Sequence, residues 1–222
     1  MRAIRALAVV ALVVVDVSAA AAQSTRGFTD SWFWGVKGGA LSYQVMSDLD
    51  GSALSPLVGF DWMITRTKGG LYVSVDQSFF DQFIFISDSI SPLDTVPRQV
   101  DLGSLRRYTI AGMLFPFESR WARPYFGLGA TLHHLGKADA LGSYRNNQQF
   151  NLVQATIAQF RATATPIFIL GTQLKLPLAS AFIQFTAAPA NENFFLYTNS
   201  NFRTSIEAGL RYNVGSSIER MQ

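Results

Sequence analysis

The sequence predicts an all-β fold, an eight-stranded antiparallel up-and-down transmembrane β-barrel. Apolar residues recur at every second position in eight successive segments, which is the period of a β-strand. The connections between these segments alternate between long and short. Hydrophobic residues make up 49% of the chain, yet after residue 22 there is no run of about 18 apolar residues. If the chain crosses a membrane, it must therefore cross with strands.

The first 22 residues have the pattern of a secretory signal peptide. Arg2 and Arg5 give a positive start, an apolar run follows, and small residues precede Ala22. We expect cleavage after Ala22, so that residues 23–222 form the barrel domain. An uncleaved anchor is the alternative, because Asp16 ends the apolar run in an unusual way. The run is, however, shorter than the about 20 residues that span a bilayer.

The first four strands are expected within residues 30–43, 57–65, 71–86 and 104–115. In the first strand, Trp34 and Val36 share one face and Lys37 lies on the other. An Arg-Thr-Lys-Gly-Gly turn ends the second strand and the third begins at once, which predicts a hairpin. A loop with two prolines, Pro92 and Pro97, is expected before the fourth strand.

The last four strands are expected within residues 123–134, 166–176, 181–187 and 203–212. The fifth alternates most clearly, with Phe126 and Leu128 on one face and Tyr125 and Gly127 on the other. Before the sixth strand, residues 147–162 place apolar side chains at helical spacing, which leaves a short amphipathic helix and a strand extension as alternatives. Strands thus lie within residues 30–214, and a short periplasmic tail, 215–222, follows.

Aromatic residues are expected at the membrane interface. If the chain starts on the periplasmic side, every tryptophan falls at the end that has the short turns, and amphipathic rings prefer that level. Outer-membrane barrels have short periplasmic turns and longer external loops. The predicted interface residues are Trp32, Trp34, Trp62, Trp121 and Tyr212.

The segment from Pro124 to Gly129 has the pattern Pro-Tyr-x-Gly-x-Gly. Together with the strand count, the loop asymmetry and a last strand that ends at Tyr212, it resembles the small outer-membrane β-barrels of the OmpA and OmpX type. The resemblance implies a bacterial outer-membrane location, contact with outer-membrane lipid and lipopolysaccharide, and insertion by the barrel-assembly machinery. The chain departs from the pattern because it continues past Tyr212 to Gln222.

Charged residues on the inward faces predict an internal network. A barrel of eight strands leaves a lumen that side chains can fill, and charges buried there must pair. The inward candidates carry both signs, so we predict salt bridges that hold the barrel; a narrow ion path gated by the same pairs is the alternative. The candidates are Lys37, Asp61, Asp76, Arg107, Lys175, Glu207 and Arg211.

The two histidines, His133 and His134, are the only candidate catalytic residues. Some barrels of the resembled type acylate or deacylate lipid A, so such an enzyme is an alternative, although a His-x-Ser arrangement is missing here. Neighbours in a strand point to opposite faces, which argues against a shared metal ion. We expect no metal and no cofactor. The net charge of +3 and the lack of a basic patch argue against nucleic-acid binding.

The sequence therefore predicts a non-enzymatic, monomeric outer-membrane protein with a structural or surface-interaction role through its longer extracellular loops. The ligand of these loops is left open. In the last loop, the apolar run from Phe194 to Tyr197 either binds a partner or the lipid head-group region, or packs between the strand tops. The competing predictions are a lipid A-modifying enzyme, a small narrow channel and a soluble lipocalin-like barrel, whose apolar faces would point inward to a ligand.

Overall fold

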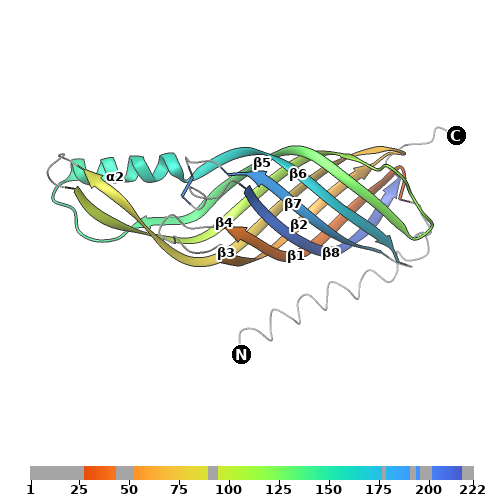
Figure 1. Cartoon of the computed structure of the whole chain (residues 1–222), viewed down its shortest axis with the longest axis horizontal. Helices are drawn as coiled ribbons and strands as arrows, with labels where there is room; N and C mark the ends of the chain where they lie inside the picture. The colour runs from red at the N-terminus through yellow and green to blue at the C-terminus, as the bar shows by residue number, and fades with distance from the viewer. Residues whose placement is uncertain are drawn as a thin grey trace, which may run out of the picture.

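A computed structural model describes residues 28–43, 53–89, 95–176, 179–190, 194–195 and 202–216. These residues form one closed barrel, in which each strand pairs antiparallel with its neighbours in the chain and the last strand pairs with the first (Figure 1). The predicted fold class is confirmed. The predicted signal peptide, residues 1–22, and residues 217–222 of the predicted tail lie outside the described residues.

The described residues form eight strands and one helix. They are β1 Ser31–Tyr43, β2 Ala53–Thr65, β3 Gly69–Ser89, β4 Thr95–Leu114, β5 Ala122–Ala140, α2 Asn147–Phe160, β6 Ala162–Lys175, β7 Ser180–Pro189 and β8 Phe202–Ser216. Three short connections, 66–68, 115–121 and 176–179, lie at one end, which we call the hairpin end. At the other end β3, β4 and β5 extend beyond their neighbours and carry α2 (Figure 1). We call this extension the platform: residues 79–89, 95–104 and 135–140 together with α2.

The predicted loop between the third and fourth strands is wrong for residues 87–89 and 95–103, which are strand, whereas Pro92 lies outside the described residues. β4 begins at Thr95 and pairs with β3 as far as Ser89, so most of that segment is a long hairpin. Pro97, predicted in the loop, lies within β4, opposite Ser87. On its other side β4 pairs with β5 only from Val100 onward, so this part of β4 is an edge, where proline is tolerated.

Of the two alternatives for residues 147–162, a short helix and a strand extension, the helix is correct. The side chain of Asn146 caps α2 by accepting a hydrogen bond from the backbone N–H of Gln149, at 2.8 Å. Val153 and Ile157, one turn apart, are buried. Their spacing places both on the face that packs on the platform strands. No helix among the described residues is both long and apolar enough to span a membrane.

The outer wall of the barrel is apolar, and polar side chains on the strands of the wall mostly face the lumen. Leu128 is 64% exposed, whereas Tyr125 on the same strand is 1% exposed and faces the lumen. This confirms the predicted faces of the fifth strand and contradicts the lipocalin-like alternative, in which apolar faces point inward. Outward apolar residues on other strands include Val36, Val58, Phe60, Val75, Ile110, Leu170, Ile183, Ile206 and Leu210. A wall of this kind favours a lipid environment.

The lumen is filled in layers. One apolar cluster lies toward the hairpin end and includes Phe33, and a second lies toward the platform and includes Leu41. Lys37 lies between these two residues on β1, so a charged layer separates the clusters. Phe194 and Phe195 are buried in the platform cluster, so packing is the right alternative for these two residues. Leu196 and Tyr197 lie outside the described residues.

Candidate functional site

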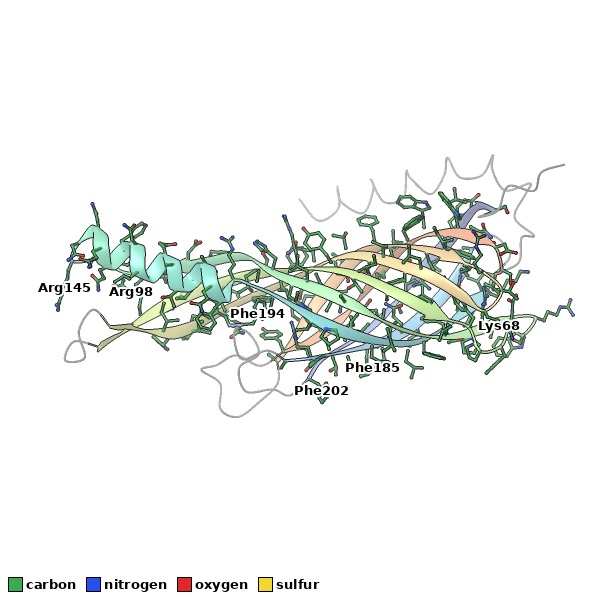
Figure 2. The ribbon with its side chains drawn as sticks, turned by 90° about the horizontal axis from the view of Figure 1, so that it is seen from above. Lys68, Arg98, Arg145, Phe185, Phe194 and Phe202 are labelled. Atoms are coloured by element: carbon green, nitrogen blue, oxygen red, sulfur yellow. The ribbon has the colours of Figure 1, made fainter. Side chains whose placement is uncertain are left out.

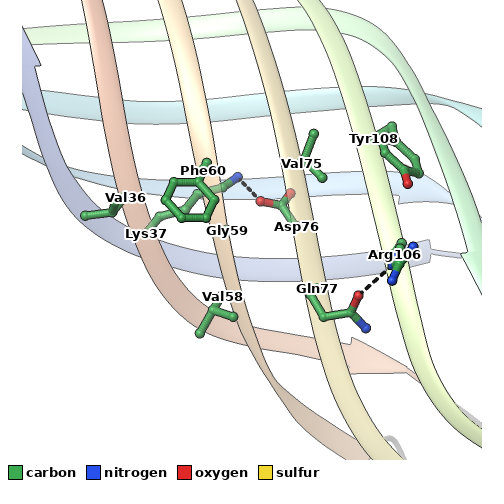
Figure 3. A pocket seen from close by; sticks show the side chains of 10 residues that line it. All are labelled: Val36, Lys37, Val58, Gly59, Phe60, Val75, Asp76, Gln77, Arg106 and Tyr108. Carbon is green, nitrogen blue, oxygen red and sulfur yellow. Dashed lines mark hydrogen bonds and ion pairs between the residues drawn. The ribbon is translucent and has the colours of Figure 1, made fainter. Parts of the chain in front are cut away.

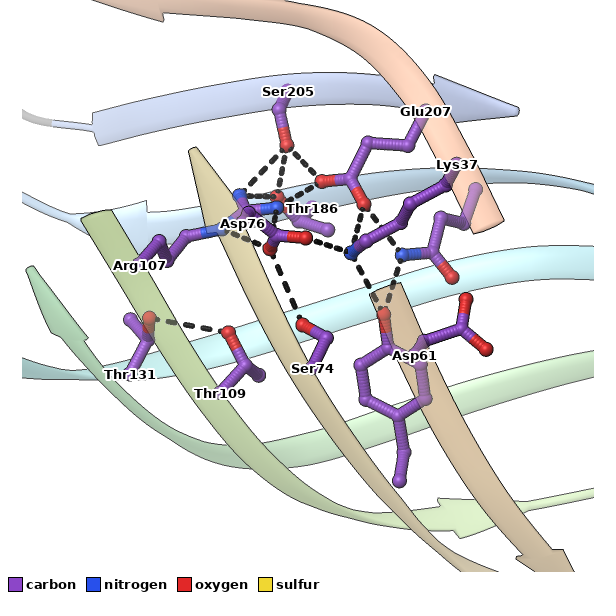
Figure 4. A network of polar contacts seen from close by, with 12 residues as sticks. Lys37, Asp61, Ser74, Asp76, Arg107, Thr109, Thr131, Thr186, Ser205 and Glu207 are labelled. Carbon is purple, nitrogen blue, oxygen red and sulfur yellow. Dashed lines mark hydrogen bonds and ion pairs between the residues drawn. The ribbon is translucent and has the colours of Figure 1, made fainter. Parts of the chain in front are cut away.

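Four charged side chains form a closed ring in the middle of the lumen (Figure 4). Lys37 on β1 lies with its Nζ 2.8 Å from Asp76 Oδ1 on β3 and 2.6 Å from Glu207 Oε2 on β8. Arg107 on β4 contacts Asp76 Oδ2 at 2.7 Å and also pairs with Glu207. Each cation thus bridges both carboxylates, and all four side chains are buried.

A second ion pair lies nearer the hairpin end. Arg211 donates from Nε to Asp61 Oδ1 at 2.8 Å and from a terminal nitrogen to Asp61 Oδ2 at 3.2 Å, which is a two-point contact. Gln184 joins the pair to the ring, because its amide nitrogen donates to Glu207 Oε2 at 2.8 Å. Its amide oxygen accepts from a terminal nitrogen of Arg211 at 3.4 Å and from Tyr125 Oη at 3.0 Å. The two sites therefore form one network.

Uncharged side chains complete the network, and they were not predicted. Tyr72 Oη accepts a hydrogen bond from Lys37 Nζ at 2.9 Å, and Ser205 Oγ donates to Glu207 at 2.6 Å. Ser74 donates to Asp76 at 3.2 Å. These residues share the inward parity of the charged ones on their strands. The alternation of inward and outward residues thus predicts that these side chains face the lumen. It does not distinguish a residue that joins the network from one that only fills space.

The network places three cations against three carboxylates, with contacts across β1, β2, β3, β4 and β8. Six of the seven predicted lumen charges are brought together in this way. Lys175 is the exception: it is exposed at the last position of β6. Its parity is inward, but the barrel opens at that level, so the side chain reaches water. The prediction for Lys175 is wrong.

Arg123 closes the lumen at the hairpin end. Its guanidinium donates to the backbone oxygens of Phe28 at 2.5 Å, Arg66 at 2.7 Å and Thr67 at 3.1 Å. It lies 3.9 Å above the ring of Phe115. These contacts fasten three separate segments below the apolar cluster.

The predicted interface aromatics lie on or near the hairpin end. Trp34 is opposite Trp62 in the β1–β2 pair and opposite Tyr212 in the β1–β8 pair. Trp32 and Trp62 contact edge to face, with ring centroids 5.8 Å apart. Trp121 is exposed in the connection between β4 and β5. The set forms a partial aromatic belt, and its position at a membrane interface stays a prediction.

The two histidines point to opposite sides of the wall. His133 is 1% exposed inside the lumen, with its ring centroid 6.3 Å from that of Phe194. His134 is half-buried on the outer face. They therefore do not share a site. Across the described part of the chain, no group of three or more histidine, aspartate or glutamate side chains is placed to hold a metal ion.

The platform has one covered face and one exposed face (Figure 2). On the covered face, Ile84 of β3 and Val100 of β4 lie in one buried cluster with Val153 of α2. On the opposite face Phe83 and Phe85 are exposed and contact edge to face, with ring centroids 5.8 Å apart. Apart from β4, no described strand pairs with β3 beyond Ser78.

A surface ion pair lies in the same region. Lys137 Nζ lies 2.6 Å from Asp101 Oδ2, across the β4–β5 pair. The hydrogen bond to Asp101 and its negative charge raise the pKa of Lys137. Both side chains are accessible to water, so this pair orients the platform more than it stabilises it.

The architecture defines a class by fold: a closed, eight-stranded, up-and-down barrel with an apolar wall and an ionic interior, as in the small outer-membrane barrels. Among solved structures, the chain is similar to Neisserial surface protein A, with a TM-score of 0.51 and 11% sequence identity over 82% of this chain and 96% of that one.

Two further solved barrels align less closely. OprG from Pseudomonas aeruginosa aligns with a TM-score of 0.44 and 13% identity, over 85% of this chain and 98% of that one. Ail of Yersinia pestis aligns with a TM-score of 0.42 and 11% identity, over 82% and 99%. No family model and no curated protein matches the sequence. The similarity to Neisserial surface protein A establishes the fold.

Proposed function

We propose that the protein is a non-enzymatic, monomeric outer-membrane barrel of a double-membraned bacterium, which holds the platform at the cell surface as an interaction site. The observation that supports this function best is the division of the described residues into an apolar wall, a packed ionic lumen and a platform at one end. Export by a cleaved signal peptide, insertion by the barrel-assembly machinery and contact with lipopolysaccharide belong to the same proposal.

The filled lumen supports a structural barrel over a narrow channel. Apolar clusters lie on both sides of the ionic ring, and Arg123 closes the hairpin end. Lys37 and Arg107 are each held by two carboxylates. An ion would have to break these contacts in order to pass.

The exposed aromatic pair on the platform supports a role in surface interaction. Phe83 and Phe85 lie beyond the part of β3 that pairs with β2, on the face of the platform opposite α2. Large aromatic side chains that are exposed to water are typical of protein interfaces. The partner that fits this face is a protein that buries both rings.

Single-cysteine labelling tests the proposed orientation, since the natural chain contains no cysteine. Arg145→Cys places a thiol beside α2 and Lys68→Cys places one at the hairpin end, the two opposite ends in Figure 2. In intact cells, a membrane-impermeant maleimide should label Arg145→Cys at once and Lys68→Cys only after the outer membrane is permeabilised. Labelling of Lys68→Cys alone in intact cells would overturn the orientation.

A further inference from the structure

The outer wall changes from apolar to basic where it meets the platform. On β4 the outward side chains run from Leu114 through Ile110 and Tyr108 to Arg106, and on β5 from Leu128 through Leu132 to His134. Arg106 and His134 are directly opposite each other in the β4–β5 pair. The same boundary is therefore marked by a basic residue on two adjacent strands.

A third basic residue adjoins them. His134 is opposite Ala162 in the β5–β6 pair, and Arg161 directly precedes Ala162. The guanidinium of Arg161 donates to the backbone oxygens of Leu135 and Gly136, at 2.9 Å each. Arg161 is thereby held beside the strand that carries His134. We call Arg106, His134 and Arg161 the basic cluster.

The height of the basic cluster matches the edge of a membrane. From Leu114 to Arg106 a strand tilted by about 40° rises by roughly 20 Å, at about 3.3 Å per residue. The apolar band of an outer-membrane barrel is about 25 Å tall. With the hairpin end on the periplasmic side, Arg106 thus lies at the level of the head groups of the outer leaflet.

Arg106 is available to an external anion. Its side chain is exposed and donates from Nε to Gln77 Oε1 at 3.0 Å, which orients the guanidinium along the wall. Three carboxylates of this region, on the half-buried Asp101 and the exposed Asp81 and Asp139, raise the pKa of Lys137 further out on the platform. Within the described residues, no carboxylate forms an ion pair with Arg106.

An apolar groove of about 480 Å³ begins beside Arg106 on the outer wall (Figure 3). Val36, Val58, Gly59, Phe60, Val75 and Tyr108 line it, Gln77 and Arg106 form a polar end, and the ring residues Lys37 and Asp76 also border it. A groove that is mostly apolar and has an exposed cation at one end complements an amphipathic anion.

We propose that the basic cluster binds the phosphate groups of an anionic lipid of the outer leaflet, and that the groove takes one acyl chain of the same lipid. The inference rests on the proposed membrane location. Guanidinium groups bind phosphate with paired, charge-assisted hydrogen bonds, and an imidazole adds a further donor. Lysine and arginine side chains near an anionic membrane surface are attracted to its head groups.

Native mass spectrometry of the folded protein in detergent tests the proposal, with diphosphorylated lipid A and dephosphorylated lipid A as probes. The double variant Arg106→Gln, His134→Gln should bind diphosphorylated lipid A about tenfold more weakly than the natural protein, and dephosphorylated lipid A equally well. Lys68→Gln removes a cation at the hairpin end and should change neither affinity. Arg161 is left intact because it fastens the end of α2.

Two arms separate the parts of the proposal. Inorganic phosphate at the same concentration should not displace lipid A, and displacement would point to a site for a free anion instead. Val58→Trp fills the groove and should weaken the binding of both lipids. Equal binding of diphosphorylated lipid A by the double variant and the natural protein overturns the proposal. In that case the labelling of Arg145→Cys and Lys68→Cys still tests the proposed membrane orientation independently of lipid binding.

Discussion

At the scale of single residues, the buried ionic ring is the feature that most constrains the sequence. Removing two or more charges from water is expensive, and the ring offsets this because each of its four members contacts two opposite charges. The contacts join residues as far apart in the chain as Lys37 and Glu207. A ring of this kind fixes which strands meet at the closing seam of the barrel.

Replacing Glu207 by glutamine should destabilise the barrel strongly. Lys37 and Arg107 would then share Asp76 alone, and leaving buried charge uncompensated costs about 3–5 kcal/mol. Urea unfolding in lipid vesicles, followed by tryptophan fluorescence, measures the loss. Asp139→Asn, on the exposed surface of the platform, is the control and should change stability by less than about 0.5 kcal/mol. An equally small effect of Glu207→Gln would show that the ring is not a stabilising contact.

Adjacent glycines on β1 provide a matched pair. A Cβ on Gly39 would lie 2.1 Å from the backbone oxygen of Ile206 on β8, whereas a Cβ on Gly38 would have only Leu57 O nearby, at 3.8 Å. Gly39→Ala should therefore cost about 1–3 kcal/mol by forcing β1 and β8 apart, and Gly38→Ala should not. The same urea assay distinguishes them. Equal stability of the two variants would mean that the seam is looser than described.

At the scale of elements, α2 depends on its cap and on one apolar stripe. Val153→Asp places a charge against the platform cluster, so the helix should detach and the connection between β5 and β6 should be cut faster by protease. Proteolysis of intact cells should accelerate about tenfold or more, while the urea midpoint of the barrel stays unchanged. Ala158→Asp, on the exposed side of α2, should behave like the natural chain. Equal cleavage of the two variants would count against a docked helix.

The sequence predicted the strands better where they pair on both sides than where they form the platform. Within the wall, successive side chains point alternately to the outer surface and to the lumen, and these two surroundings favour different residues. Leu128 and Tyr125 could therefore be assigned to their faces from the sequence. Beyond the wall that contrast weakens, and bulges shift the register of β3 and β4 after Phe79 and Leu102. The extension of β4 back to Thr95 and the choice of helix for α2 therefore required the structure.

At the scale of the whole molecule, closure explains both the success and the limits of the site prediction. Inward parity identified six members of the network, because a closed lumen forces their side chains together. It could not exclude Lys175, since parity contains no information on the height at which the barrel opens. Nor could parity identify Arg106 as a candidate binding residue. Its proposed role depends on its lying at the edge of the apolar wall, beside a basic residue of the adjacent strand.

The central claim is that the barrel wall meets lipid and the platform meets water. Leu128→Cys and Leu152→Cys each place one thiol on an exposed apolar position, the first in mid-wall and the second on α2. Each variant is labelled with bimane and reconstituted in phosphatidylcholine vesicles. Brominated lipid should quench the label of Leu128→Cys and aqueous iodide that of Leu152→Cys. Quenching of the Leu128→Cys label by iodide, without an effect of brominated lipid, would contradict a membrane-embedded wall.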